Sequence, residues 1–366
     1  MRTERLPLLA LAMGLLLAGL WAGLVRLGWG WPPLAPSLPM AHGPLMVGGF
    51  LGTLIGLERA IALARRWAYA APILAGAGAI LAAAGLHPWG PLLITAGSLV
   101  LVAITLTIAR IHLASHTVVL AVAAGCWLVG NLLWLGGFTI PQVVLWWAGF
   151  LTLTIAGERL ELSRFLRPPR WAGALFVALV ALLVMGMALA AVDYRAGTQL
   201  TGLGWLLLAL WLWRFDIARR RVGAGGQARY MALCLLAGYF WLGAAGGMAL
   251  AYGGVMAGPH YDALLHALFV GFVFSMIFAH ALIIFPVVLG VALEYHPRFY
   301  LPLALLHASL ALRIGGDLLP WWPGRLWGGL LTVVTLLLFL ASTAASLRRH
   351  RTVAPAVPSR PVLRQP

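Results

Sequence analysis

The segment "MAHGPLMVGGFLGTLIGLERAIAL" (residues 40–63) decides the fold class of this chain. Near its start stands His42, and an almost entirely apolar run separates this histidine from Glu58 and Arg59. A run of this length is typical of a helix that crosses a lipid bilayer, and ionisable groups in such a helix face the inside of a bundle because lipid does not solvate charge. The segment therefore predicts a membrane helix with polar chemistry at both ends.

The composition extends this prediction to the whole chain. Its 366 residues are 62% hydrophobic and 9% charged, whereas about a quarter of the residues in a soluble domain are charged. Because lipid forces the backbone to satisfy its own hydrogen bonds, we predict an all-α polytopic membrane bundle of about twelve transmembrane helices. The predicted spans are residues 7–28, 41–64, 68–86, 90–111, 116–137, 140–163, 171–192, 197–215, 229–252, 260–291, 299–318 and 326–347.

These spans are expected to form one transmembrane domain over residues 1–351. The remaining segment, "TVAPAVPSRPVLRQP" (residues 352–366), is rich in proline and has no apolar run. Such a composition does not supply a core, so we predict a disordered cytoplasmic tail.

The net charge of +16 comes from arginine, because the chain contains no lysine. The arginines lie in short loops rather than in one patch interleaved with aromatic residues, so no nucleic-acid partner is predicted. By the positive-inside rule we predict a multi-pass protein of a bacterial inner membrane, surrounded by lipid, with both termini in the cytoplasm. The arginines that this topology leaves outside are Arg26, Arg195, Arg313 and Arg325.

An internal repeat suggests how the helices are grouped. The segments "GFLGTLIGLER" (residues 49–59) and "GFLTLTIAGER" (residues 149–159) align without gaps at an offset of 100 residues. They lie in the second and sixth predicted spans. The tenth span contains "GFVFSMIFAH" (residues 271–280), with His280 in place of the repeated glutamate. Because these spans are four apart, we predict a pseudo-threefold arrangement of four-helix units.

His42 and His266 are candidate metal ligands. Both lie in the first turns of spans that run in the same direction, so we expect them at the same depth near the outer face. A pair of imidazoles facing across a helix bundle is how a b-type haem is held, although each histidine could instead be a core residue hydrogen-bonded to a neighbour. Glycines that would let a flat macrocycle lie close to the helices are Gly43, Gly48, Gly49 and Gly271.

A second group of ionisable residues is predicted at the opposite end of the helices, where Glu58 lies about 24 Å below His42 by the helical rise. We favour a network of Glu–Arg pairs that anchors the helix ends, with histidines as hydrogen-bonding partners. The alternative is a second metal site, or a proton or quinone site. The residues available for it are His112, His116, His280, Glu58 and Glu158.

The histidine segments resemble motifs of the haem–copper oxidase catalytic subunits. "AHGPLMVGGF" (residues 41–50) is similar to the helix-2 motif in which a His-Gly-x-x-Met segment supplies an axial ligand of the low-spin haem. The segment that follows His266 resembles the helix-10 motif, in which Phe-Pro comes about twenty residues later, as Phe285 and Pro286 do here. The resemblance implies that His42 and His266 ligate one haem, within twelve helices in three groups of four.

The chain also departs from those oxidases. Leu264 stands where they place the high-spin haem ligand, and there is no histidine between His116 and His260 for the copper site. Oxygen reduction at the usual binuclear centre is therefore not predicted.

The chain is more similar to the NnrS-type membrane proteins, twelve-helix haem- and copper-containing proteins associated with nitric oxide metabolism. "TIAGERLELSRF" (residues 154–165) resembles their helix-6 Ala-Gly-Arg region, with Glu158 added before the arginine. The Gly-His-Thr-Gly-Arg segment expected after helix 10 is missing, and "FPVVLG" stands there instead. This resemblance implies haem b, copper as a second metal, and a role in denitrification-related metabolism or electron transfer.

These observations predict an integral membrane b-type haem protein with a quinone or a periplasmic redox partner; they do not indicate catalytic residues. The rival prediction is a cofactor-free, proton-coupled transporter or exporter, in which His42, Glu58, Glu158 and His280 line a path through the bundle. A structural partner of a respiratory complex is a third alternative.

Overall fold

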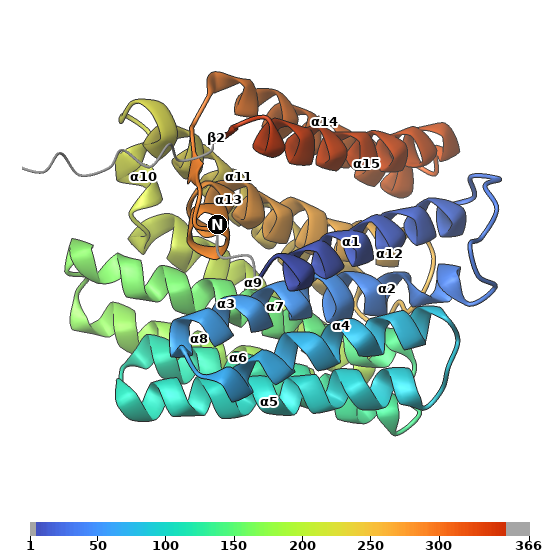
Figure 1. Ribbon diagram of the computed structural model, residues 1–366, viewed down its shortest axis with the longest axis horizontal. Coiled ribbons are helices and arrows are strands. Elements are labelled where there is room, and N and C mark those ends of the chain that lie inside the picture. Colours follow the sequence, from blue (N-terminus) through green and yellow to red (C-terminus); the bar gives the residue numbers. More distant parts are fainter. Residues whose placement is uncertain (1–4, 349–366) are drawn as a thin grey trace, which may run out of the picture.

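The computed structural model describes residues 5–348, so the predicted tail at residues 352–366 lies outside the described part. The helices run side by side along the long axis of the molecule (Figure 1). Within residues 5–348, eleven helices are long and apolar enough to cross a membrane. The prediction of an all-α polytopic membrane bundle is therefore confirmed.

Most of the spans are single α-helices. They are α1 (Leu6–Leu27), α5 (Trp89–Ile111), α6 (Ser115–Leu135), α8 (Arg170–Leu189), α9 (Tyr194–Phe215), α11 (Gly226–Tyr252) and α15 (Trp322–Ala344). Others include a short 3-10 turn: η4 (Arg66–Tyr69) before α4 (Ala70–Ala83), η5 (Arg164–Leu166) after α7 (Ile140–Ser163), and η7 (Pro297–Phe299) before α14 (Tyr300–Leu318). A further short helix, α10 (Ala218–Arg221), follows α9.

The second and tenth spans are composite. The second consists of the 3-10 turn η2 (Leu38–Ala41), α2 (His42–Pro44), the π-helical segment η3 (Leu45–Leu51) and α3 (Gly52–Leu63). The tenth consists of α12 (Pro259–His266), the π-helical segment η6 (Ala267–Phe274) and α13 (Ser275–Leu289). The π-helical geometry therefore begins directly after His266 in the tenth span, and two residues beyond His42, after Pro44, in the second.

The helix α9 is the only long helix of the described chain that falls outside the eleven apolar spans. It has 22 residues, but Arg195, Thr198 and Gln199 make its first half polar. It packs between α8 and α11. With α9 included, the number and positions of the long helices agree with the twelve predicted spans.

The three spans that share the repeat form the centre of the bundle. In their most apolar windows, 61% of the second span, 72% of the sixth and 67% of the tenth is buried, whereas the other apolar spans are 39% to 50% buried. Each helix packs against its neighbour in the sequence, and α15 returns to contact α1. Three inner helices within a ring of outer helices are what three units of four helices would give.

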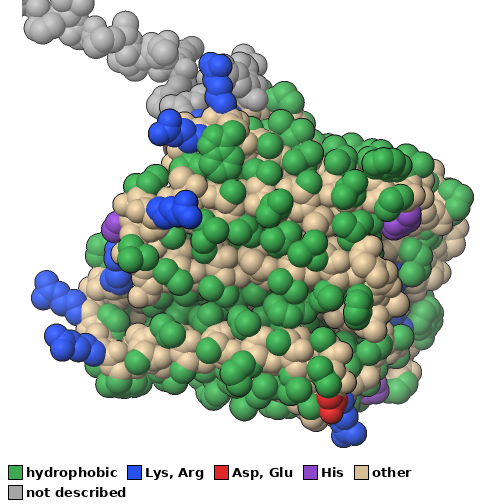
Figure 2. All heavy atoms as spheres, turned by 90° about the horizontal axis from the view of Figure 1, so that it is seen from below, with side chains coloured by type: hydrophobic (Ala, Val, Ile, Leu, Met, Phe, Trp, Pro, Cys, Tyr) green, Lys and Arg blue, Asp and Glu red, His purple; other side chains and the backbone are tan. Residues whose placement is uncertain are grey.

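Charge is distributed unequally between the two ends of the bundle. We call the end with His42 and His266 the histidine end, and the opposite end, with Glu58 and Arg59, the arginine end. Figure 2 shows hydrophobic side chains along one face of the bundle and arginines gathered at one end of it, on the left. The cytoplasmic location of the arginine end is still a prediction, which rests on this bias.

Both ends of the described chain lie at the arginine end. Arg5, just before α1, donates a hydrogen bond to the carbonyl of Val287 near the end of α13. The two-residue strand β1 (Ala292–Leu293), after α13, pairs antiparallel with β2 (Leu347–Arg348), after α15. These contacts tie the start and the end of the helix ring to the tenth span.

Candidate functional site

The structure brings His42 and His266 together at the histidine end. His42 opens α2 directly after the turn η2, and His266 is the last residue of α12. The centres of their rings are 6.4 Å apart, and the ring planes differ by only 15°. His266 keeps 17% of its side-chain surface accessible, although both rings lie within apolar spans.

Both imidazoles are fixed through the same nitrogen. Nδ1 of His42 lies 2.8 Å from the carbonyl oxygen of Gly19 on α1, and Nδ1 of His266 lies 2.8 Å from the carbonyl oxygen of Asp262, one turn earlier on α12. A carbonyl only accepts hydrogen bonds, so Nδ1 carries the proton in both rings. Within residues 5–348 no hydrogen bond engages Nε2 of either ring, which leaves its lone pair free for a ligand.

The spacing of the two rings suits a metal ion between them. An imidazole nitrogen lies about 2 Å from a bound metal and the ring centre about 1 Å further, so two ligands on opposite sides have ring centres about 6 Å apart. The observed 6.4 Å agrees with this separation. A hydrogen bond from the other ring nitrogen to a carbonyl is the usual second contact of a metal-bound histidine, and both rings have one.

The two π-helical segments continue the correspondence between the second and tenth spans. Phe50 in η3 and Phe274 in η6 each follow their histidine by eight residues, and their rings are 6.0 Å apart with an angle of 20° between the planes. Both rings line an apolar groove between α1, α3, α13 and α15. Short π-helical segments are rare and often lie at functional sites.

The glycines next to this site act differently from the prediction. Gly43, Gly48, Gly49 and Gly271 face neighbouring helices: a Cβ atom on them would meet side chains such as Ile94 for Gly48 and Trp241 for Gly271. They let helices approach one another. Gly23 on α1 is the glycine that borders the histidine pair, because a Cβ atom there would lie 2.9 Å from Cε1 of His42.

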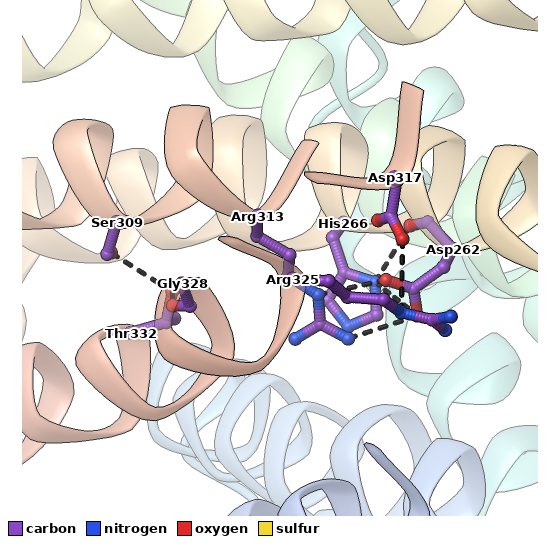
Figure 3. A network of polar contacts seen from close by, with 8 residues as sticks. All are labelled: Asp262, His266, Ser309, Arg313, Asp317, Arg325, Gly328 and Thr332. Carbon is purple, nitrogen blue, oxygen red and sulfur yellow. Dashed lines mark hydrogen bonds and ion pairs between the residues drawn. The ribbon is translucent and has the colours of Figure 1, made fainter. Parts of the chain in front are cut away.

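A cluster of charged residues surrounds Asp262, one helical turn before His266. This cluster was not predicted from the sequence. Arg313 donates two hydrogen bonds to the carboxylate of Asp262, at 2.9 and 3.0 Å. Arg325 lies 3.8 Å from the same carboxylate and 3.0 Å from that of Asp317. Figure 3 shows Arg313 from α14 and Arg325 from α15 meeting Asp262 and His266. From the sequence alone, these two arginines were predicted only to lie on the outer side of the membrane.

At the arginine end, the repeated Glu-Arg pairs form contacts between the inner helices. Arg59 in the second span forms an ion pair with Glu158 in the sixth and lies 3.5 Å from Glu58. Arg159, the repeat partner of Arg59, binds Asp216 at the end of α9 with hydrogen bonds of 2.8 and 3.0 Å. This arrangement is the helix-anchoring network that we favoured, with Asp216 as a partner that the repeat does not reveal.

His280 takes part in this network as a hydrogen-bonding partner. Its Nδ1 lies 2.7 Å from the carbonyl of Met276, and its Nε2 lies 3.4 Å from Nη1 of Arg159. Arginine only donates, so Nε2 of His280 accepts from it. Both ring nitrogens of His280 thus already have protein partners.

His112 and His116 do not share one helix. The helix α5 ends at Ile111, His112 is extended and exposed, and α6 begins at Ser115. His116 is buried, with Nε2 3.7 Å from a carboxylate oxygen of Glu161. In the described part of the chain, no three His, Cys, Asp or Glu residues lie close enough to hold a metal ion. Of the five residues considered for a second metal site, His112 and His116 have ring centres 5.7 Å apart and Glu58 and Glu158 share Arg59. His280 binds Arg159 instead.

Comparison with known families gives one match. A family model described as a domain of unknown function, DUF8744, matches residues 5–348. No curated protein matches the chain.

Proposed function

We propose that this chain, which belongs to the DUF8744 family, is an integral membrane protein that binds one b-type haem between His42 and His266. The observation that carries the proposal is the geometry of this pair: nearly parallel rings 6.4 Å apart, each with Nδ1 bound to a carbonyl and Nε2 free. A metal ion between the rings would use the free Nε2 lone pairs of both histidines at once.

The residues around the pair suit electron transfer. A haem with two imidazole ligands has no open coordination position and exchanges electrons more readily than it binds a gas. The contact of Nδ1 in His266 with the Asp262 carbonyl orients the ring and makes the imidazole a stronger donor. The carbonyl of Gly19 on α1 positions His42, and Arg313 positions Asp262 beside His266. The two histidines are thus positioned by different contacts. A role in nitric oxide metabolism would rest on the resemblance alone, and nitric oxide binding would require one histidine to leave or a second metal to be present.

The optical spectrum of the purified full-length protein tests the proposal. Protein made in cells with an ample haem supply should be red, with a Soret band and about one haem per chain. Reduction should give the sharp bands of a low-spin haem, and carbon monoxide should leave them unchanged because His42 and His266 would together leave no open position on the iron. A colourless protein would contradict the proposal and favour the transporter alternative.

Gly23→Ala should lower the haem content several-fold. The new methyl group would lie 2.9 Å from His42 Cε1, which is closer than carbon atoms approach without repulsion, so the ring must move and its contact with the Gly19 carbonyl is disturbed. The matched control is Gly14→Ala on the same helix, where a Cβ atom meets nothing within 4 Å. Haem per chain and circular dichroism would be measured for both variants. Equal haem content in the two variants would argue against the assigned position of the cofactor.

A further inference from the structure

A basic hollow lies at the arginine end, away from the histidine pair. It has a volume of about 640 Å³ and lies between the loop that joins α7 to α8 and the end of α9. Four arginines line it, namely Arg167, Arg214, Arg219 and Arg220. All four side chains are exposed, and within residues 5–348 none of them forms an ion pair with an aspartate or glutamate. The hollow thus contains four positively charged side chains that have no acidic partner within the described residues.

The one acid in the wall does not offset these charges. Both oxygens of Asp216 accept hydrogen bonds from Arg159, and one of them also accepts from the backbone N–H of Ala218 at 2.7 Å. The carboxylate is buried and its charge is matched by the guanidinium beneath it. Pro169 and Trp171, at the start of α8, also line the hollow, so the positive end of that helix dipole adds to the field.

Aromatic residues beside the hollow indicate that it lies at the level of lipid headgroups. Trp171, which is 60% exposed, packs edge-on against Phe215, and exposed tryptophans gather at the membrane interface. Further along α8, Leu175 and Val177 are exposed on the outside of the bundle. A molecule with its anionic group among the arginines could therefore lay apolar chains along α8.

We propose that this hollow binds the phosphate headgroup of an anionic phospholipid. Basic pockets between membrane helices are known to select such headgroups, and arginine matches phosphate through paired N–H donors. Free phosphate shares the headgroup chemistry but not the apolar chains. The exposed leucine and valine side chains of α8 favour the lipid as the occupant.

Native mass spectrometry of the delipidated full-length protein in neutral detergent tests this site. Phosphatidylglycerol should bind as one tightly held molecule, whereas phosphatidylcholine with the same chains should not. Arg219→Gln/Arg220→Gln should weaken phosphatidylglycerol binding by about tenfold or more. Arg219→Lys/Arg220→Lys, which keeps the charge, should fall between this variant and the wild type and guards against misfolding of the glutamine variant.

The matched control removes the same charge from the same end. Arg65 and Arg66 are also adjacent and exposed at the arginine end but do not line the hollow, so Arg65→Gln/Arg66→Gln should bind phosphatidylglycerol as the wild type does. Equal weakening in this control would overturn the proposal in favour of general surface charge. Equal binding of phosphatidylcholine would overturn it as well. Displacement of the lipid by millimolar inorganic phosphate would assign the hollow to a free anion instead.

Discussion

Replacement of His42 or His266 by alanine is expected to remove the low-spin haem spectrum completely. Each imidazole would supply one axial nitrogen to the iron, and the ring of the partner cannot reach across 6.4 Å to replace it. Haem per chain should fall at least several-fold in each single variant and to near zero in the double variant. Residual haem in a single variant should be high-spin and should now bind carbon monoxide, because one axial position is open.

His112→Ala is the matched control for this experiment. His112 is exposed at the arginine end, so its loss should change neither the spectrum nor the iron and copper content of the protein. Circular dichroism and size-exclusion chromatography would show that all variants are folded. A Soret band of wild-type height in the double histidine variant would contradict the haem proposal. Loss of metal in His112→Ala would support the second metal site.

Asp216→Asn is expected to cause the largest loss of stability among conservative substitutions of charged residues. The side chains of Arg159 and Asp216 are 2% and 1% exposed, and two hydrogen bonds join them. Removal of the carboxylate leaves the guanidinium buried without a counter-charge, which typically costs about 3–5 kcal/mol. His280 would keep its contact with Arg159 but does not supply a negative charge. Thermal unfolding in detergent, followed by circular dichroism, measures the effect.

Glu158→Gln provides the comparison. Arg59 and Glu158 are 13% and 29% exposed, and Arg59 keeps Glu58 at 3.5 Å when Glu158 is neutralised. A partly exposed pair with a remaining partner should lose no more than about 1 kcal/mol. If the two substitutions lowered the unfolding temperature equally, burial would not explain the role of Asp216.

The positions of the helices could be predicted from the sequence because a long apolar run is itself the property that places a helix in lipid. The positions of the spans followed from hydropathy, and the equal depth of His42 and His266 followed from helical rise. The partners of Arg159 did not follow, because the repeat suggests that Arg159 should behave like Arg59. The structure instead pairs it with Asp216, which ends a different helix.

The candidate site was predicted only in part for a related reason. Spacing along one helix places a histidine in depth but does not say which neighbouring backbone accepts its proton. Gly19 and Gly23 are four residues apart and so lie on one face of α1, a pattern that indicates close helix packing. That spacing was a signal for the α1 contact of His42. The position of Asp262, four residues before His266, was a similar local signal.

Because of the π-helical segments η3 and η6, the number of residues in the second and tenth spans matters more than which apolar residues they contain. Each residue of an α-helix turns the chain by about 100°, and a π-helical turn holds one residue more than an α-helical turn. Deletion of one residue from Leu45–Leu51 would turn His42 by about that angle relative to Arg59. The number of residues between them thus determines whether His42 can face His266 while Arg59 faces Glu158. Replacement of one apolar residue by another within these segments preserves the angle between the two ends of the span, whereas insertions and deletions change it.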